Sequence, residues 1–132
     1  MKTKLVGACA LVDLNGRVLI NQRPKGKDFE GFWEFPGGKV ENDENPEDAV
    51  IRELKEEIDI DVNSACLAPL SFSEARYNDT HVLILLYIAR KWEGIIKPLE
   101  NQKIVWVKPK DISAYEILPA DKSFFPILRD LI

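Results

Sequence analysis

The sequence contains few residues able to form covalent cross-links or soft-metal sites: two cysteines and one histidine in 132 residues. Cys9 and Cys66 lie in GACALV and SACLAPL, without a pairing motif or metal-ligand spacing. We expect both to be small buried hydrophobic residues of a protein from a reducing compartment, without a disulfide. Neither cysteine lies near a histidine in an arrangement typical of nucleophilic catalysis. His81, alone at the start of an apolar run, favours a structural role.

Long hydrophobic runs are also missing. No segment approaches the length of a membrane span, and the N-terminus has no secretory signal core before Asp13, so we expect a cytoplasmic protein that does not bind membranes. Basic residues are outnumbered, with a net charge of −4, which argues against a nucleic-acid polymer as partner. A small phosphate ligand held through a metal ion is compatible with that charge. We find no repeat or linker, and the length predicts a single domain over residues 1–132.

Apolar runs and turn signals predict a mixed β-sheet with helices packed on it, an α/β or α+β sandwich. The expected strands cover residues 4–12, 18–21, 66–76, 81–92 and 103–107. Asn15-Gly16 predicts a hairpin turn between the first two, and 81–92 is apolar enough for a central strand. Residues 22–38 are expected to form a long loop, of the kind that is often functional. Trp33, Trp92 and Trp106 are expected to pack in or beside the core.

Three helices are expected, of which the one over residues 46–58 has the clearest signals. Asn45 is a favoured N-cap and Pro46 fits the first helical position. Asp111 could cap a short helix over 111–115. A C-terminal helix is expected from about Ala120, and Pro126 either interrupts it or marks its true start.

The helix over 46–58 and its flanks are unusually acidic. Nine acidic residues fall between positions 37 and 60: Glu41, Asp43, Glu44, Glu47, Asp48, Glu53, Glu56, Glu57 and Asp59. At about 100° per residue, the apolar residues form a core-facing stripe, and three glutamates form a separate patch beside it. The stripe comprises Val50, Ile51, Leu54 and Ile58, and the patch comprises Glu53, Glu56 and Glu57.

Three neighbouring carboxylates oppose one another's ionisation unless a cation compensates. Their hard oxygen donors suit Mg²⁺ or Mn²⁺, and Mg²⁺ commonly completes its shell with substrate phosphates. The patch therefore indicates half of a metal site whose other half is a phosphate chain. The alternative is a solvated acidic face partnered by Arg52 and Lys55.

Gly38, Glu44 and the run Arg52-Glu53-Leu54-Lys55-Glu56-Glu57 stand in a register that resembles the Nudix box, the signature of hydrolases of nucleoside-diphosphate-linked compounds. WEFPGGKVE, ARKWEG and LPADKSFFPILRDLI are similar to the MutT-type branch, which removes oxidised guanine nucleotides. The resemblance runs along essentially the whole chain and implies the Nudix α/β/α sandwich, with helices on both faces of a mixed sheet.

The resemblance also implies roles for individual residues. The implied metal ligands are Glu53, Glu56, Glu57, the Gly37 carbonyl and Glu100. Glu53 is also the implied base for the attacking water, Arg52 orients the glutamates, and Lys39 approaches a phosphate or the water. The implied substrate-binding residues are Arg23, Glu34, Gly38 and Asp121.

Two positions depart from the family pattern. Asp59 stands where the box has glycine, at a helix end where the chain often turns through φ > 0, which aspartate tolerates at a modest cost. Asp121 stands where the MutT-type branch has a purine-reading asparagine. N7 of ordinary guanine is an acceptor, whereas N7 of 8-oxoguanine carries a proton. An aspartate at 121 could accept from that N–H while repelling an unprotonated N7, or it could merely cap a helix.

The sequence thus predicts a Mg²⁺-dependent pyrophosphohydrolase, acting by resemblance on 8-oxo-dGTP, as a monomer or homodimer. Three alternatives are open at this point. One is a Nudix enzyme for another nucleotide, such as CTP, dGTP or a dinucleoside polyphosphate. The second is a nucleotide-binding module without catalysis, and the third is the acidic solubilising face.

Overall fold

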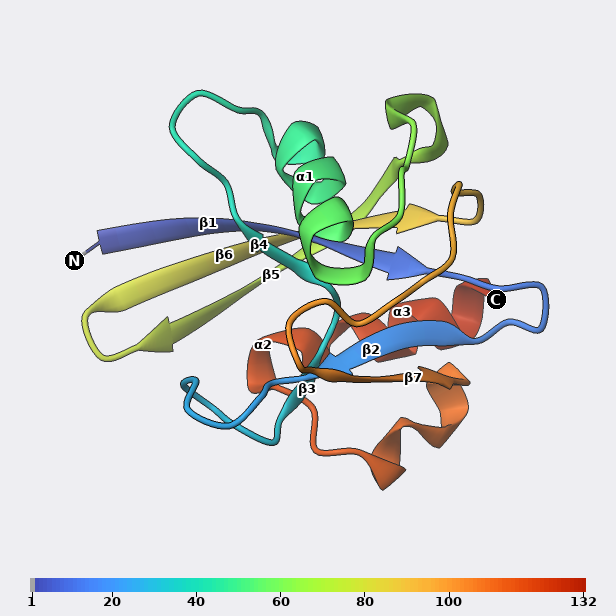
Figure 1. The fold of residues 1–132 in the computed structure, drawn as a ribbon. Coiled ribbons are helices and arrows are strands. Elements are labelled where there is room, and N and C mark those ends of the chain that lie inside the picture. Colours follow the sequence, from blue (N-terminus) through green and yellow to red (C-terminus); the bar gives the residue numbers. More distant parts are fainter. Residues whose placement is uncertain (1) are drawn as a thin grey trace.

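The computed structural model describes residues 2–132, whose strands form two sheets (Figure 1). The first sheet has four strands in the order β4-β1-β6-β5. These are β1 (Lys2–Leu11), β4 (Gly37–Lys39), β5 (Ala68–Tyr77) and β6 (Thr80–Ala89). Only β1 and β6 pair in parallel, so this sheet is mixed. The second sheet is antiparallel, with β2 (Val18–Gln22) between β3 (Trp33–Glu34) and β7 (Lys103–Val107).

Helices cover both faces of the mixed sheet. In Figure 1, α1 (Pro46–Ile58) lies above it, while α2 (Pro119–Lys122) and α3 (Phe124–Leu131) lie below. Two 3₁₀ segments complete the helical elements, Ser64–Cys66 and Pro109–Ala114. The predicted class, an α+β fold with a mixed sheet and helices on both faces, is confirmed.

The alternation of side chains along β1 builds the two sides of the core. Cys9 and Leu11 pack with the apolar stripe of α1, whereas Ala8 and Ala10 pack with Phe124 of α3. β6 lies between β1 and β5 and alternates in the same way, as expected for a central strand. β1 and β6 present apolar side chains on both faces of the sheet. The packing of α1 on one face and of α3 on the other therefore fixes the positions of these helices.

Helix α1 forms as its sequence predicts. The Asn45 side chain accepts from the backbone N–H of Asp48 at 2.9 Å, and Pro46 opens the helix. The helix ends at Ile58, and the next residue, Asp59, adopts the left-handed conformation with φ of 62°. The backbone turn expected at this position is therefore present without glycine, and aspartate tolerates it better than most residues.

Other expectations were wrong in detail. The turn at Asn15-Gly16 closes only one bridge, between Val12 and Val18, and β2 then joins the second sheet. β1 and β2 therefore do not form a hairpin, because β2 pairs with β3 and β7 instead. The segment 22–38 is not one loop, since it contains β3 and the start of β4.

The C-terminal part also differs from expectation. Asp111 caps no helix, because the 3₁₀ segment already begins at Pro109 and makes no side-chain cap bond. The C-terminal helix is divided into α2 and α3 at Ser123. Pro126 lies in the first turn of α3, where backbone N–H groups have no helical partner, so of the two expectations for this proline the second, that it marks the start of a helix, holds.

The tryptophans pack as predicted. Trp92 and Trp106 stack with ring centroids 6.0 Å apart, and Trp33 contacts Tyr115 edge to face. His81 Nε2 lies 2.8 Å from a carboxylate oxygen of Glu74 on the neighbouring strand.

Cys9 and Cys66 are free thiols. Cys9 is fully buried as expected, whereas the expectation that Cys66 is buried was wrong, because it is partly exposed. No helix within residues 2–132 has both the length and the apolar character that crossing a bilayer requires.

Candidate active site

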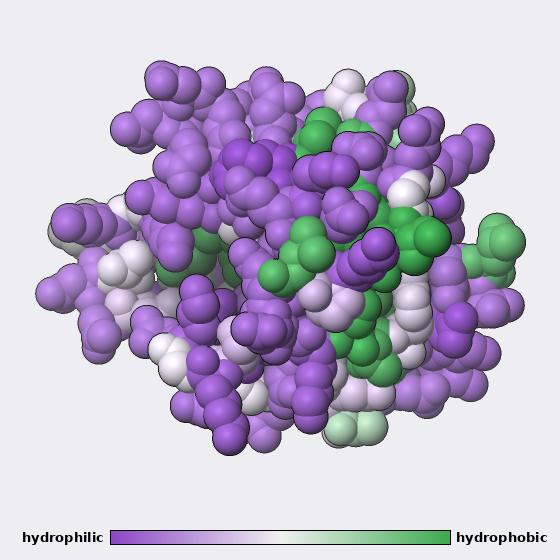
Figure 2. All heavy atoms as spheres, viewed as in Figure 1, coloured by the Kyte–Doolittle hydropathy of each residue, from purple (hydrophilic) through white to green (hydrophobic). Residues whose placement is uncertain are grey.

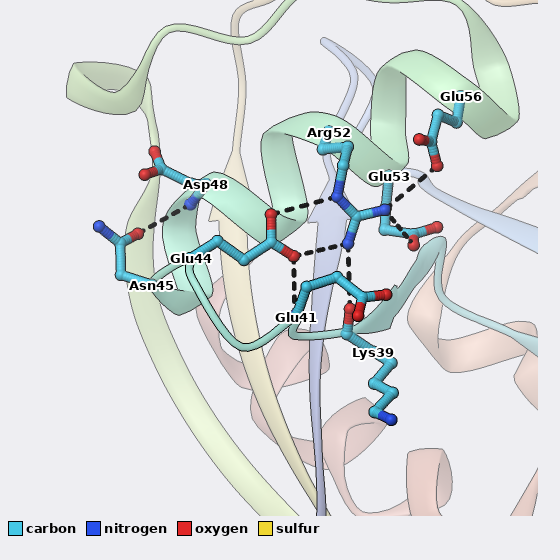
Figure 3. A network of polar contacts seen from close by, with 8 residues as sticks. All are labelled: Lys39, Glu41, Glu44, Asn45, Asp48, Arg52, Glu53 and Glu56. Carbon is cyan, nitrogen blue, oxygen red and sulfur yellow. Dashed lines mark hydrogen bonds and ion pairs between the residues drawn. The ribbon is translucent and has the colours of Figure 1, made fainter.

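Arg52 is the centre of a network of carboxylates on the exposed side of α1 (Figure 3). Its guanidinium binds Glu44 through two nitrogens, at 2.6 and 3.1 Å. It also donates to Glu53 at 2.8 Å, to Glu56 at 3.2 Å and to the Lys39 carbonyl at 3.0 Å. These contacts hold Glu53 in one orientation, and the bond from Arg52 lowers the pKa of the Glu44 carboxyl. Hydrophilic residues cover much of the molecular surface around this helix (Figure 2).

Glu57 lies on the inner side of the same helix and is buried, with 9% of its surface exposed. Its carboxylate accepts from the Gly37 backbone N–H at 2.9 Å and from the Asn21 side-chain amide at 3.3 Å. Two donors, from β4 and β2, thus hold a carboxylate that has no bond to Arg52.

A small pocket of about 140 Å³ lies beside these carboxylates. Its lining includes Glu53, Glu57 and Glu100, and also Arg23, Glu34 and Gly37. The pocket therefore brings Glu100, from the segment before β7, to the same space as two glutamates of α1.

A larger cleft of about 700 Å³ adjoins the pocket, and the two share Arg23, Glu34 and Gly37. Gly38, Lys39 and Asp121 line this cleft as well. All of the site residues predicted from the sequence, except Arg52 and Glu56, therefore line at least one of the two spaces. Arg52 instead acts on its neighbours, and Glu56 is turned toward Arg52 with about half of its side chain exposed.

Arg23 and Glu34 form an ion pair at 2.9 Å where the pocket and the cleft meet. Asp121 lies deeper in the cleft wall, 4% exposed, and accepts from the Phe35 backbone N–H at 3.0 Å. Burial and the nearby Glu34 raise the pKa of Asp121 to about 7. Asp121 is therefore a buried carboxyl group that changes charge near neutral pH.

The two glycines of β4 leave room for different neighbours. A Cβ atom on Gly38 would stand 2.5 Å from the carboxyl carbon of Glu53. A Cβ atom on Gly37 would collide with the Gly7 carbonyl oxygen of β1 and lie 2.6 Å from Ala8 Cα. Gly37 therefore lets β4 lie directly against the backbone of β1, and Gly38 leaves the space that the flexible carboxylate of Glu53 occupies.

Burial raises the pKa of Glu57, and repulsion from Glu53 adds to the effect. Burial also raises the pKa of Glu53, although Arg52 opposes it. The two carboxyl groups consequently favour holding a proton over carrying two charges. A cation in the pocket would remove this penalty by replacing the proton.

No group of three or more His, Cys, Asp or Glu side chains within residues 2–132 is arranged as a ready metal cluster. The donor chemistry of the pocket nevertheless fits a hard divalent cation. Several carboxylates line it, and so does Asn21, whose buried Oδ1 has no hydrogen-bond partner among the described residues. Such an oxygen can accept from a water molecule or bind a cation.

The structure adds two pocket residues to which no sequence motif pointed, Asn21 and Gln102. Asn21 shares a face of β2 with Leu19, which packs against α1, so strand alternation carries it toward Glu57. The sequence did contain one signal for Asn21, because it is a polar residue at the end of the apolar run VLIN. Nothing local marked Gln102, because the groups that it bonds are backbone groups, one of them distant in the sequence.

Comparisons with known proteins show the family of this chain. The NUDIX domain family model matches residues 1–130. A CTP pyrophosphohydrolase of Escherichia coli K12 is 34% identical over 113 residues, covering 85% of this chain and 82% of that protein. An 8-oxo-dGTP diphosphatase of Proteus vulgaris is 41% identical over 94 residues, covering 70% of this chain and 82% of that protein.

Among solved structures, one from a study of MutT of Aliivibrio salmonicida and Vibrio cholerae superposes with a TM-score of 0.83. It is 28% identical, and the match covers 99% of this chain and 100% of that one. The chain belongs to the Nudix family. It is a Nudix hydrolase, and Nudix hydrolases generally use divalent metal ions.

Proposed function

We propose that this enzyme hydrolyses 8-oxo-dGTP to 8-oxo-dGMP and pyrophosphate with Mg²⁺, or Mn²⁺, as cofactor. The observation that supports this most is the junction of the carboxylate pocket with the larger cleft at Arg23, Glu34 and Gly37. A triphosphate in the pocket would place its nucleoside in the cleft, which has Asp121 in its wall. The relatives named 8-oxo-dGTP diphosphatase support the same substrate.

The residues on and around α1 perform the chemistry in this proposal. Glu53, Glu56, Glu57, Glu100 and the Gly37 carbonyl would hold the cation. The bound cation would neutralise charge on the phosphate oxygens. Glu53 accepts a proton from the attacking water, and Arg52 keeps Glu53 in the orientation that this transfer needs. Water attacks the α- or the β-phosphorus, the bond from that phosphorus to the bridging oxygen breaks, and the nucleoside monophosphate and pyrophosphate are released.

The remaining residues bind the nucleotide. Lys39 and Arg23 offer cationic groups to the phosphates, and Gly38 leaves room beside Glu53. Glu34 holds Arg23 in place through their ion pair. Asp121 accepts from the protonated N7 of 8-oxoguanine. We also propose that the enzyme acts on oxidised DNA precursors in the cytoplasm. It would do so as a monomer or homodimer that binds no nucleic-acid polymer.

A second candidate is the hydrolysis of CTP, and Asp121 is the observation that favours it. A carboxylate accepts from the N4 amino group of cytosine, whereas an asparagine can also donate to O6 of a purine. The similarity to a CTP pyrophosphohydrolase points the same way.

A nucleotide panel separates these candidates. Rates for 8-oxo-dGTP, dGTP, CTP and a dinucleoside polyphosphate would be measured by pyrophosphate or phosphate release, with the wild type and Asp121→Asn. We expect 8-oxo-dGTP to give the highest kcat/KM. A preference for CTP that Asp121→Asn lowers would replace the first proposal with the second. Tight nucleotide binding without turnover in Mg²⁺ would refute both.

Reaction in ¹⁸O-labelled water then identifies the phosphorus that is attacked. Label in the nucleoside monophosphate shows attack at the α-phosphorus, and label in pyrophosphate shows attack at the β-phosphorus.

A further inference from the structure

The segment that carries Glu100 is fastened to the C-terminal end of α1. The backbone N–H of Lys97 donates to the Ile58 carbonyl at 3.0 Å, and that of Leu99 donates to the Glu57 carbonyl at 2.9 Å. These carbonyls belong to the last turn of the helix, where no helical N–H is available. The segment therefore supplies the donors that the helix end lacks.

Gln102 makes the third attachment and is buried, with 7% of its surface exposed. Its Nε2 donates to the Glu57 carbonyl at 2.8 Å, and its Oε1 accepts from the Glu100 N–H at 2.8 Å. One side chain thus connects the backbone of a helical glutamate to the backbone of the distant one. A primary amide can do this because it carries a donor and an acceptor together.

Glu100 itself is exposed, and its carboxylate makes no hydrogen bond within residues 2–132. Its position in the pocket is set by its backbone. The next residue, Asn101, has φ of 58°, a conformation uncommon for residues other than glycine. The turn at 100–101 is thus held between the Leu99 attachment and Gln102.

We propose that Gln102 is a positioning residue that fixes Glu100 beside Glu53 and Glu57 for cation binding. This inference rests on the proposed function, because it assigns Glu100 a place among the cation ligands. Both ends of the Gln102 amide are engaged by backbone groups, so Gln102 acts through the backbone of its two partners.

The test measures Mn²⁺ binding to the substrate-free enzyme by electron paramagnetic resonance, so that it does not depend on turnover. Gln102→Met keeps the length of the side chain and removes both hydrogen bonds. Gln102→Asn keeps the amide but is too short to bond both partners at once. Neither change alters the charge of the pocket. We expect each variant to raise the Kd for Mn²⁺ about five- to tenfold, because Glu100 loses its fixed position.

Val107→Ala is the stability control, since Val107 is buried in β7 and lines neither space at the site. We expect it to lower Tm while leaving the Kd for Mn²⁺ unchanged. Glu100→Gln supplies a double-mutant cycle. If Gln102 acts through Glu100, Gln102→Met should add little to the effect of Glu100→Gln.

Unchanged Mn²⁺ affinity in both Gln102 variants would overturn the inference and leave the proposed function standing. Equal effects of Gln102→Met in the wild-type and Glu100→Gln backgrounds would also overturn it. A wild type that binds no Mn²⁺ would overturn the cation site of the proposed function, and this inference with it.

Discussion

At the scale of single residues, the environment of each carboxyl group decides what it can do. Glu44 is paired with a guanidinium, and its pKa is lowered. Glu57 is buried beside another carboxyl group, and its pKa is raised. The same type of side chain therefore favours its ionised form in one place and its protonated form in another.

Glu53→Gln tests the proposed base. We expect turnover to fall by about 10²- to 10⁴-fold, the usual contribution of a general base. Folding should be retained, because the change removes a charge from a like-charged pair and keeps the shape. Steady-state rates and thermal unfolding measure both effects.

Glu47→Gln is a matched control on the same helix, because Glu47 lines neither the pocket nor the cleft. It should keep wild-type turnover. Wild-type turnover in Glu53→Gln would remove Glu53 from the mechanism.

Asp121 predicts a pH dependence of stability. Its pKa in the folded protein, about 7, lies above the ordinary value of 3.8. The folded state therefore binds a proton that the unfolded state releases, and stability is lost as pH rises through this window. The variant Asp121→Asn has no ionisable group at this position, so it should gain stability relative to wild type between pH 5 and pH 8.

The gain should be on the order of 2–4 kcal/mol, from the size of the pKa difference. Denaturant unfolding of both proteins at the two pH values measures this gain. The contributions of all other titrating groups cancel in the difference between the two proteins. Parallel pH profiles would show that Asp121 is not held in a raised-pKa environment.

At the scale of elements, β4 joins the site to the sheet through its two glycines. Gly38→Ala should displace the carboxylate of Glu53, which is the flexible end of a side chain, and so lower turnover at least about tenfold with little change in Tm. Gly37→Ala meets backbone atoms of β1, which cannot move aside, and should destabilise the fold by about 3 kcal/mol or more.

Thermal unfolding and turnover of the two variants provide the comparison. An inactive Gly38→Ala protein that is also unfolded, or a fully active one, would contradict the role given to β4.

Helix α1 was predictable from residue 46 to residue 58 because its signals are local. The cap at Asn45, the proline after it and the apolar stripe lie within the segment itself. β2 was located correctly, yet its partner was not, because pairing depends on strands far away in the sequence. The start of α3 close to Pro126, by contrast, agrees with a local signal, because proline fits the first turn of a helix but not its interior.

For the molecule as a whole, cation binding and proton binding should compete. Mg²⁺ or Mn²⁺ added to chelator-treated protein should raise Tm, because a ligand that binds the folded state stabilises it. The rise should be larger at pH 8 than at pH 6, since the raised pKa values of Glu53 and Glu57 favour protons at the lower pH.

Differential scanning fluorimetry at the two pH values measures this, and Glu57→Gln, which removes one of the two competing carboxyl groups, is the comparison. No response of Tm or of nucleotide cleavage to either cation would contradict the cation site.

That residues 1–132 act as one domain stays a prediction.

Periodicity and spacing are local properties of the chain, and they were enough to establish the helix, the register of its glutamates and the family resemblance. They also indicated the glycines beside the glutamates. Folding was needed to settle which carboxylates share a pocket, because β2, β4 and the segment before β7 meet α1 through contacts between distant residues. Asn21 and Gln102 were identified only from the tertiary structure, because the contact of each with Glu57 is formed by folding.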